Sequence, residues 1–141
     1  SKVKDIFGIF HNAIAFNQPL NKWSISHLTD LSYLFDGAIK FNQPLNLWDT
    51  SKVESMSYMF AGTTDFNQPL NSWDVSKVKY MSYMFHDAKN FNQNLESWNT
   101  SSLIDKELIF FGTKSLKKLP FWFHNSKKLE QYYNSKYNIV N

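Results

Sequence analysis

The segment Phe66-Asn67-Gln68-Pro69-Leu70 decides how this chain folds, because it returns at a fixed step of 25 residues. Earlier copies begin at Phe16 and Phe41. A later copy begins at Phe91 and differs only at Asn94, which stands in place of the proline. Residues outside this segment keep the same step, so a whole structural unit is repeated rather than one short motif.

The repeated unit has the length of one coil of a solenoid. Residues 51–75 and 76–100 are identical at 14 of 25 positions, far more than composition alone would produce. A repeat of roughly 20–50 residues cannot bury its apolar face alone and buries it against its neighbours. The sequence therefore predicts coils that begin at residues 1, 26, 51, 76 and 101. The apolar columns that share the step are Val3, Leu28, Val53, Val78 and Leu103; Phe10, Phe35, Phe60, Phe85 and Phe110; and Trp23, Trp48, Trp73 and Trp98.

The first half of each coil has the pattern of a short helix. In the third coil, Ser51 and Glu54 have the spacing of a capping box. Gly62 stands where the end of a helix favours a left-handed residue. Between them, apolar residues recur at steps of three and four, as on one helical face; they are Val53, Met56, Met59 and Phe60.

The second half of each coil has the pattern of a short strand. Pro69 prevents a helix from continuing through the loop. Leu70, Trp73 and Val75 then follow at spacings of three and two, which resembles the L-x-x-L-x-L core of a leucine-rich repeat. We therefore predict an α/β repeat fold. It is a right-handed, leucine-rich-repeat-like solenoid with one short parallel strand and one short helix in each 25-residue coil.

The repeat decays near its end and divides the chain into two regions. Residues 1–112 form the predicted solenoid, and residues 113–141 form a degenerate C-terminal cap with a basic, aromatic tail. Lys106 already occupies a column that is apolar in the other coils, and the Phe121–Phe123 segment is expected to replace the missing tryptophan. A terminal repeat needs a polar outer face, which is what this region offers.

Charge separates the same two regions. Residues 1–112 hold 9 Lys and 11 acidic residues, whereas residues 113–141 hold 6 Lys and 1 acidic residue. Lysines interleaved with aromatic rings are typical of binding to nucleic acid or to an anionic surface. However, Ser126–Asn138 also has the pattern of a capping helix. We favour the cap, do not expect nucleic acid as the partner, and keep docking through the C-terminal tail as the alternative.

Composition excludes several classes of protein. The 141 residues include no Cys, which excludes a disulfide scaffold. A hydrophobic share of 43%, with 13 Phe, 7 Tyr and 5 Trp, is ample for a packed core and excludes wholesale disorder. The chain has no apolar run long enough to span a membrane and no visible signal or anchor segment.

The repeated polar and aromatic residues are expected to be structural. The Asn column (beginning at Asn17) and the Gln column (beginning at Gln18) could form a polar ligand site, but stacked amides also bond coil to coil, because each amide is both donor and acceptor. The Phe and Trp columns could be stacking platforms, yet a repeat requires an identical core more than an identical ligand contact. We expect core packing for both, and partial exposure for Tyr33, Tyr58 and Tyr83.

Positions that vary from coil to coil are better candidates for binding, since packing does not dictate them. The residues on either side of each Trp are expected to line the exposed face of the predicted sheet. That extended surface is the usual partner site in solenoids. The candidate ligand-binding residues on this strand face are Lys22, Ser24, Asp49, Ser72, Asp74, Ser97 and Asn99.

Catalysis and metal binding have little support in the sequence. Neither His11 nor His86, which share a column, has a partner at the spacing of a zinc site. The chain contains no nucleophile elbow, phosphate-binding loop or dinucleotide fingerprint. Asp49 and Asp74 are expected to stack on neighbouring coils, but an open carboxylate pair more often only faces solvent. We therefore predict no enzyme activity, catalytic residue, metal or cofactor.

The pattern F-N-Q-P-L-N-x-W-D-x-S-K-V-x-x-M-S-Y-M-F resembles the 25-residue repeats of the mycoplasma-lipoprotein type, which are grouped with BspA-like leucine-rich-repeat surface proteins. The resemblance covers residues 1 to about 112. Many such proteins are bacterial and some are encoded by large DNA viruses, and adhesion to host molecules is the activity most often attached to them. The resemblance implies an exposed location at the cell surface or outside the cell, or in a virion.

Two functions follow as hypotheses. The first is a non-enzymatic repeat scaffold that binds a protein or glycan through the strand face, as a surface adhesion or interaction module. The second is a structural or cementing component of an assembly such as a viral particle, with the basic aromatic tail docked to a neighbour.

Overall fold

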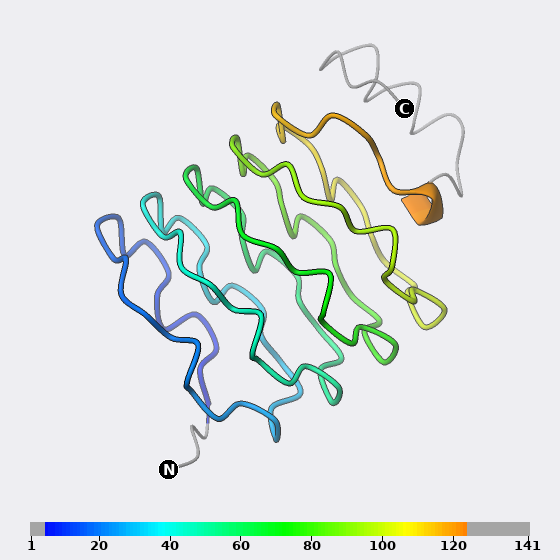
Figure 1. Ribbon diagram of the computed structural model, residues 1–141, viewed down its shortest axis with the longest axis horizontal. Coiled ribbons are helices and arrows are strands. Elements are labelled where there is room, and N and C mark those ends of the chain that lie inside the picture. Colours follow the sequence, from blue (N-terminus) through cyan, green and yellow to red (C-terminus); the bar gives the residue numbers. More distant parts are fainter. Residues whose placement is uncertain (1–4, 124–141) are drawn as a thin grey trace.

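A computed structural model describes residues 5–123 of the chain (Figure 1). The predicted coils lie side by side and advance in order from the N-terminal to the C-terminal end of one stack (Figure 1). Within the described range, the only regular element with named bounds is the 3-10 helix η1 (Phe121–Phe123). No helix in this range is long and apolar enough to cross a bilayer.

The segment predicted to be helical instead bonds to the neighbouring coil. In the third coil, the backbone N–H groups of Met56, Tyr58 and Phe60 donate to carbonyl oxygens of the fourth coil at 2.8, 3.0 and 2.9 Å. A helix would direct these donors four residues back along its own axis. The predicted helix is therefore replaced by a chain of turns whose alternate N–H groups point along the stack. Left-handed residues at Tyr58 (φ 60°) and Gly62 (φ 68°) make these turns.

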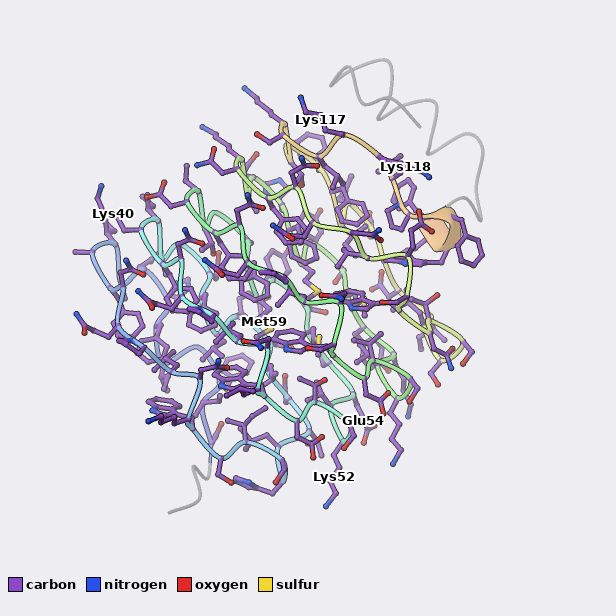
Figure 2. The ribbon with its side chains drawn as sticks, viewed as in Figure 1. Lys40, Lys52, Glu54, Met59, Lys117 and Lys118 are labelled. Atoms are coloured by element: carbon purple, nitrogen blue, oxygen red, sulfur yellow. The ribbon has the colours of Figure 1, made fainter. Side chains whose placement is uncertain are left out.

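The expected capping box also serves the coil-to-coil contact. The backbone N–H of Glu54 donates to the carbonyl of Thr29 at 2.7 Å, and the Glu54 carboxylate pairs with Lys79 Nζ at 3.4 Å. Both partners belong to neighbouring coils (Glu54 is labelled in Figure 2). Glu54, whose spacing from Ser51 indicated a helix start, therefore bonds to the two neighbouring coils instead.

Between residues that are both within 5–123, parallel pairing occurs at a different place from the predicted strand. Isolated parallel bridges join Asp30 to Ser55, Ser55 to Tyr80, and Tyr80 to Asp105. In the predicted strand Leu70–Val75, the Trp73 N–H instead closes a turn on the Leu70 carbonyl at 3.1 Å. Parallel backbone bonding thus runs along the segment expected to be helical. The described coils therefore lack the predicted helix and strand. The leucine-rich-repeat-like solenoid class stays a prediction.

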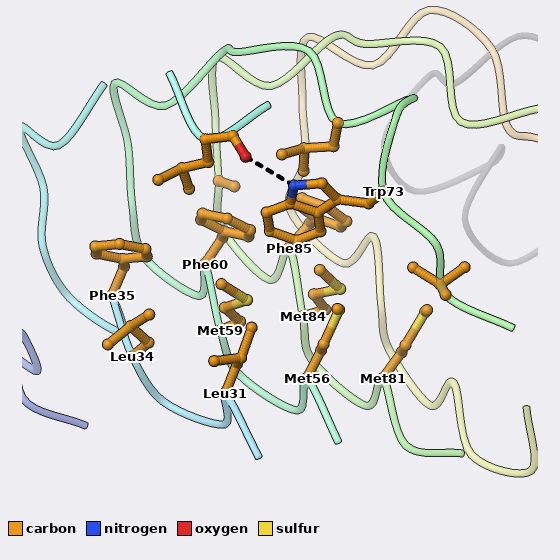
Figure 3. Packing of buried hydrophobic residues seen from close by; sticks show 14 of the residues in the cluster. Leu31, Leu34, Phe35, Met56, Met59, Phe60, Trp73, Met81, Met84 and Phe85 are labelled. Carbon is orange, nitrogen blue, oxygen red and sulfur yellow. Dashed lines mark hydrogen bonds between the residues drawn. The ribbon is translucent and has the colours of Figure 1, made fainter. Parts of the chain in front are cut away.

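The aromatic columns form the core, as expected. Phe35, Phe60 and Phe85 have no exposed surface and stack at 5.6 Å between ring centroids (Figure 3). Trp48 and Trp73 stack at 6.4 Å and are nearly fully buried. Each buried indole N–H needs an acceptor, and that of Trp73 donates to the Leu45 carbonyl of the preceding coil at 2.9 Å (dashed line in Figure 3).

The amide columns hold the coils together, which confirms their structural interpretation. Asn67 Oδ1 accepts the backbone N–H of Asn92 at 2.9 Å and Nε2–H of Gln93 at 2.9 Å. The same pattern joins Asn42 to Asn67 and Gln68. A side chain that replaces a backbone acceptor in this way satisfies the loop without a strand.

The end of the array closes as the sequence indicated, with one difference. Trp122 and Phe123 are buried, and the Trp122 indole donates to the Leu95 carbonyl at 2.9 Å. Phe121 was expected to share this role but is 70% exposed. Burial lowers the pKa of Lys106, which stands in an apolar column. The predicted capping helix at Ser126–Asn138 lies outside the described residues.

Candidate functional site

The seven predicted binding residues all lie on the surface, on either side of the tryptophan column. We call this surface the Trp-flanking face; its members are Lys22, Ser24, Leu47, Asp49, Ser72, Asp74, Ser97 and Asn99. All eight are exposed, and the Trp48 and Trp73 rings lie buried beneath them. The coils therefore bring these residues together in two rows, although the backbone beneath them is not a strand.

In one row of this face, three side chains accept a hydrogen bond from the backbone of their own turn. Oδ1 of Asp49, Asp74 and Asn99 each accepts the backbone N–H two residues later at 3.0 Å. Hydrogen bonds from Ser76 hold the pKa of Asp74 below its ordinary value, and Ser51 does the same for Asp49. These carboxylates are therefore ionised at neutral pH. Each has a second oxygen that makes none of these turn bonds.

In the other row, two residues bond to the preceding coil and two do not make this bond. Ser72 Oγ and Ser97 Oγ donate to the carbonyls of Asn46 and Asn71 in the preceding coils, each at 3.1 Å. Leu47, in the same column, cannot make this bond, and its side chain is 69% exposed. Lys22 fills the same position in the first coil. A cation and an apolar side chain thus replace the serines at one end of the face.

A second surface feature, which the sequence interpretation did not select as a site, is a ladder of aromatic rings whose three tyrosines are half-buried. Tyr33, Tyr58 and Tyr83 stack at successive centroid distances of 4.7 Å. Phe7 extends the ladder at 5.5 Å from Tyr33, with 53% of its surface exposed. Gly8 occupies the Tyr column in the first coil, so the ring comes from the preceding residue. A hollow of about 370 Å³ lies between Phe7, His11 and Tyr33.

The tyrosines hold a backbone conformation that ordinary side chains disfavour. Their φ angles are 61°, 60° and 59°, in the left-handed region. Gly8, with φ 60°, was the one sequence signal that this column turns left-handed. Ring stacking contributes about 0.5–1.5 kcal/mol per pair, which offsets the roughly 1–2 kcal/mol cost of the left-handed backbone.

We expect Tyr58→Gly to be more stable than Tyr58→Ala by about 1 kcal/mol, although glycine is usually the more destabilising of the two. Both variants lose the same ring contacts, but only glycine adopts the positive φ freely. Urea unfolding of the two variants measures the difference. A more stable alanine variant would contradict the left-handed assignment.

His11 and His86 each lie beside a carboxylate. His11 Nδ1 lies 3.2 Å from Asp36 Oδ2, and His86 Nδ1 lies 3.4 Å from Asp87 Oδ2. Burial raises the pKa of Asp36, and the neighbouring His11 partly opposes this shift. Among residues 5–123, no group of three or more His, Asp or Glu is placed to hold a metal ion.

A family model described as "Mycoplasma protein of unknown function, DUF285" matches residues 4–123. The chain belongs to this family. The DUF285 match covers the amide loops, the aromatic columns and η1, so the repeat and the buried end at Trp122 and Phe123 fall within one family unit. No curated protein and no solved structure matches the chain. The match supports a mycoplasma-type repeat family and names no activity for it.

Proposed function

We propose that this DUF285 protein is a non-enzymatic solenoid scaffold that binds a protein or glycan through the Trp-flanking face. The observation that supports the proposal is that the contacts between coils repeat, whereas some exposed side chains differ between coils. Asn, Trp and turn residues repeat their contacts from coil to coil. The column of Lys22, Leu47, Ser72 and Ser97 changes over the first three coils and keeps serine in the third and fourth.

The chemistry of this face favours a partner with mixed character. Leu47 offers an apolar contact with most of its surface in water. Asp49 and Asp74 supply negative charge on the neighbouring row, and Lys22 supplies positive charge at one end. A surface that combines apolar and charged side chains suits a protein surface or a glycan with hydroxyl groups and an apolar ring face.

The location and the finer family relation belong to the same proposal. The repeat resembles BspA-like leucine-rich-repeat surface proteins, and that resemblance supports exposure at a cell surface and adhesion as the role of the binding. A structural role within an assembly such as a viral particle is the competing outcome of the experiment below.

The test compares the intact chain with a face variant carrying Lys22→Glu and Leu47→Lys. A matched control carries Lys89→Glu and Ile104→Lys at exposed positions outside this face; Ile104 is 71% exposed. Both variants must show the urea unfolding curve of the intact chain. Immobilised proteins are then challenged with a glycan array and with extracts of host surface proteins.

We expect the face variant to lose at least about tenfold in affinity for the partner, equivalent to about 1.4 kcal/mol, while the control binds as the intact chain does. Equal loss in both variants, or retention in both, would overturn the assignment of this face. Absence of any partner, together with recovery of the intact chain from particles, would favour the assembly role.

A further inference from the structure

The outer surface of the first coil is apolar where the same columns of the other coils are buried. Ile9 is 49% exposed, whereas its column is fully buried further along, at Leu34, Met59, Met84 and Ile109. Phe10, Phe16 and Trp23 are only partly buried, although Phe35, Phe41 and Trp48 of the second coil are almost completely covered. We call this surface the N-terminal face; its members are Ile9, Phe10, Phe16, Asn17, Gln18 and Trp23.

The N-terminal face also carries donors whose equivalents are bonded in the later coils. The Asn42 N–H and Gln43 Nε2–H donate to Asn17 Oδ1 at 2.9 and 3.0 Å, and the Trp48 indole donates to the Leu20 carbonyl at 2.9 Å. The third and fourth coils repeat these bonds. Within residues 5–123, no such bond is made by the Asn17 N–H, Gln18 Nε2–H or Trp23 Nε1–H.

The same face presents the acceptor half of the backbone ladder. Each coil donates alternate N–H groups to the next coil: those of Leu31, Tyr33 and Phe35 reach the carbonyls of Ser55, Ser57 and Met59, each at 2.9 Å. The corresponding carbonyls of the first coil belong to residues 5, 7, 9 and 11. None of these four accepts a backbone N–H from the described part of the chain.

These observations define the occupant. We propose that the N-terminal face is the docking site for a further 25-residue coil of the same repeat, joined in the same polypeptide as the other coils are joined to one another. An Asn side chain in that coil bonds Asn17 and Gln18, its Leu carbonyl accepts the Trp23 indole, and its N–H groups meet the four carbonyls. Its aromatic rings cover Phe10 and Phe16.

A second copy of this chain fits the N-terminal face less well. Lys117 occupies the Asn column in the last coil, so the opposite end of a second molecule lacks the amide acceptor. Trp122 and Phe123 are already buried at that end. Two N-terminal faces placed together would set carbonyl rows against each other. This inference concerns the end of the stack and stands independently of the Trp-flanking face.

The test adds a copy of residues 51–75 directly before residue 1, which keeps the 25-residue register. The matched control adds the same copy with Phe60→Ser and Phe66→Ser within the added coil only. Hydrogen exchange of the assigned Trp23 indole N–H, measured by NMR at two protein concentrations, is compared with that of Trp48. Thermal unfolding and light scattering are recorded for all three chains.

In the extended chain, we expect Trp23 exchange to slow at least about tenfold, toward the rate of Trp48, because the opening of a bonded group limits its exchange. We also expect the melting temperature to rise by several degrees, because the added coil buries apolar surface. The control extension should produce neither change. Trp23 already protected in the unextended monomer, or unaffected by the added coil, would overturn the proposal. Protection that grows with concentration alongside dimer formation would also overturn it, in favour of a second copy.

Discussion

Replacing Trp73 with alanine is expected to lower the free energy of unfolding by about 3–5 kcal/mol. The side chain is 4% exposed, stacks on Trp48 at 6.4 Å and lies 6.2 Å from the Phe60 ring. Its removal leaves a cavity between coils and also strips the Leu45 carbonyl of its indole donor. Urea unfolding followed by circular dichroism measures the loss.

The matched control for this prediction is Ser72→Ala, one residue away on the surface. It removes one exposed hydrogen bond, from Ser72 Oγ to the Asn46 carbonyl, and opens no cavity. We expect a loss of no more than about 1 kcal/mol. Similar losses for the two variants would contradict the core role of the Trp column.

Ending the chain after residue 112 is expected to prevent formation of a stable, soluble monomer. The removed segment includes Leu116, Leu119, Trp122 and Phe123, which are at most 5% exposed. Each such side chain contributes about 1.5–3 kcal/mol through burial, so together they rival the roughly 5–15 kcal/mol that stabilises a typical domain. Dye binding to exposed apolar surface and light scattering measure the outcome.

A chain ending after residue 123 is the control for this truncation, because it retains all four of these buried side chains. We expect it to remain monomeric and to bind far less dye than the chain that ends at residue 112. If the shorter chain stayed monomeric with an unchanged melting temperature, the closing role of Trp122 and Phe123 would be refuted.

The core and the amide columns could be predicted from the sequence because the same residue types recur at each step of 25 residues. Trp73 and Asn67 recur with their neighbours, and only a shared contact between adjacent coils explains such constancy. The residues of the Trp-flanking face could be placed at the surface for the opposite reason, since Lys22 and Leu47 differ where the frame does not. Which partner they contact depends on chemistry that the repeat does not encode.

The local backbone could not be predicted in the same way. Met56, Met59 and Phe60 have helical spacing, but a coil of successive turns also returns side chains to one side every three or four residues. The two structures differ in the direction of their backbone N–H groups. The spacing of apolar residues does not reveal that direction. Tyr58 gave no sign of its left-handed backbone, because bulky residues rarely adopt it; Gly8 in the same column was the available clue.

The lateral direction of the backbone bonds has a mechanical consequence. Stacked tyrosine rings advance 4.7 Å from coil to coil, while each coil stores 25 residues of chain. Fully extended, those residues would span roughly 80–90 Å. Tension on the two ends would therefore peel coils away one at a time, each release lengthening the molecule many-fold over the distance that it occupied. Single-molecule pulling is expected to record this release as a regular series of equal steps.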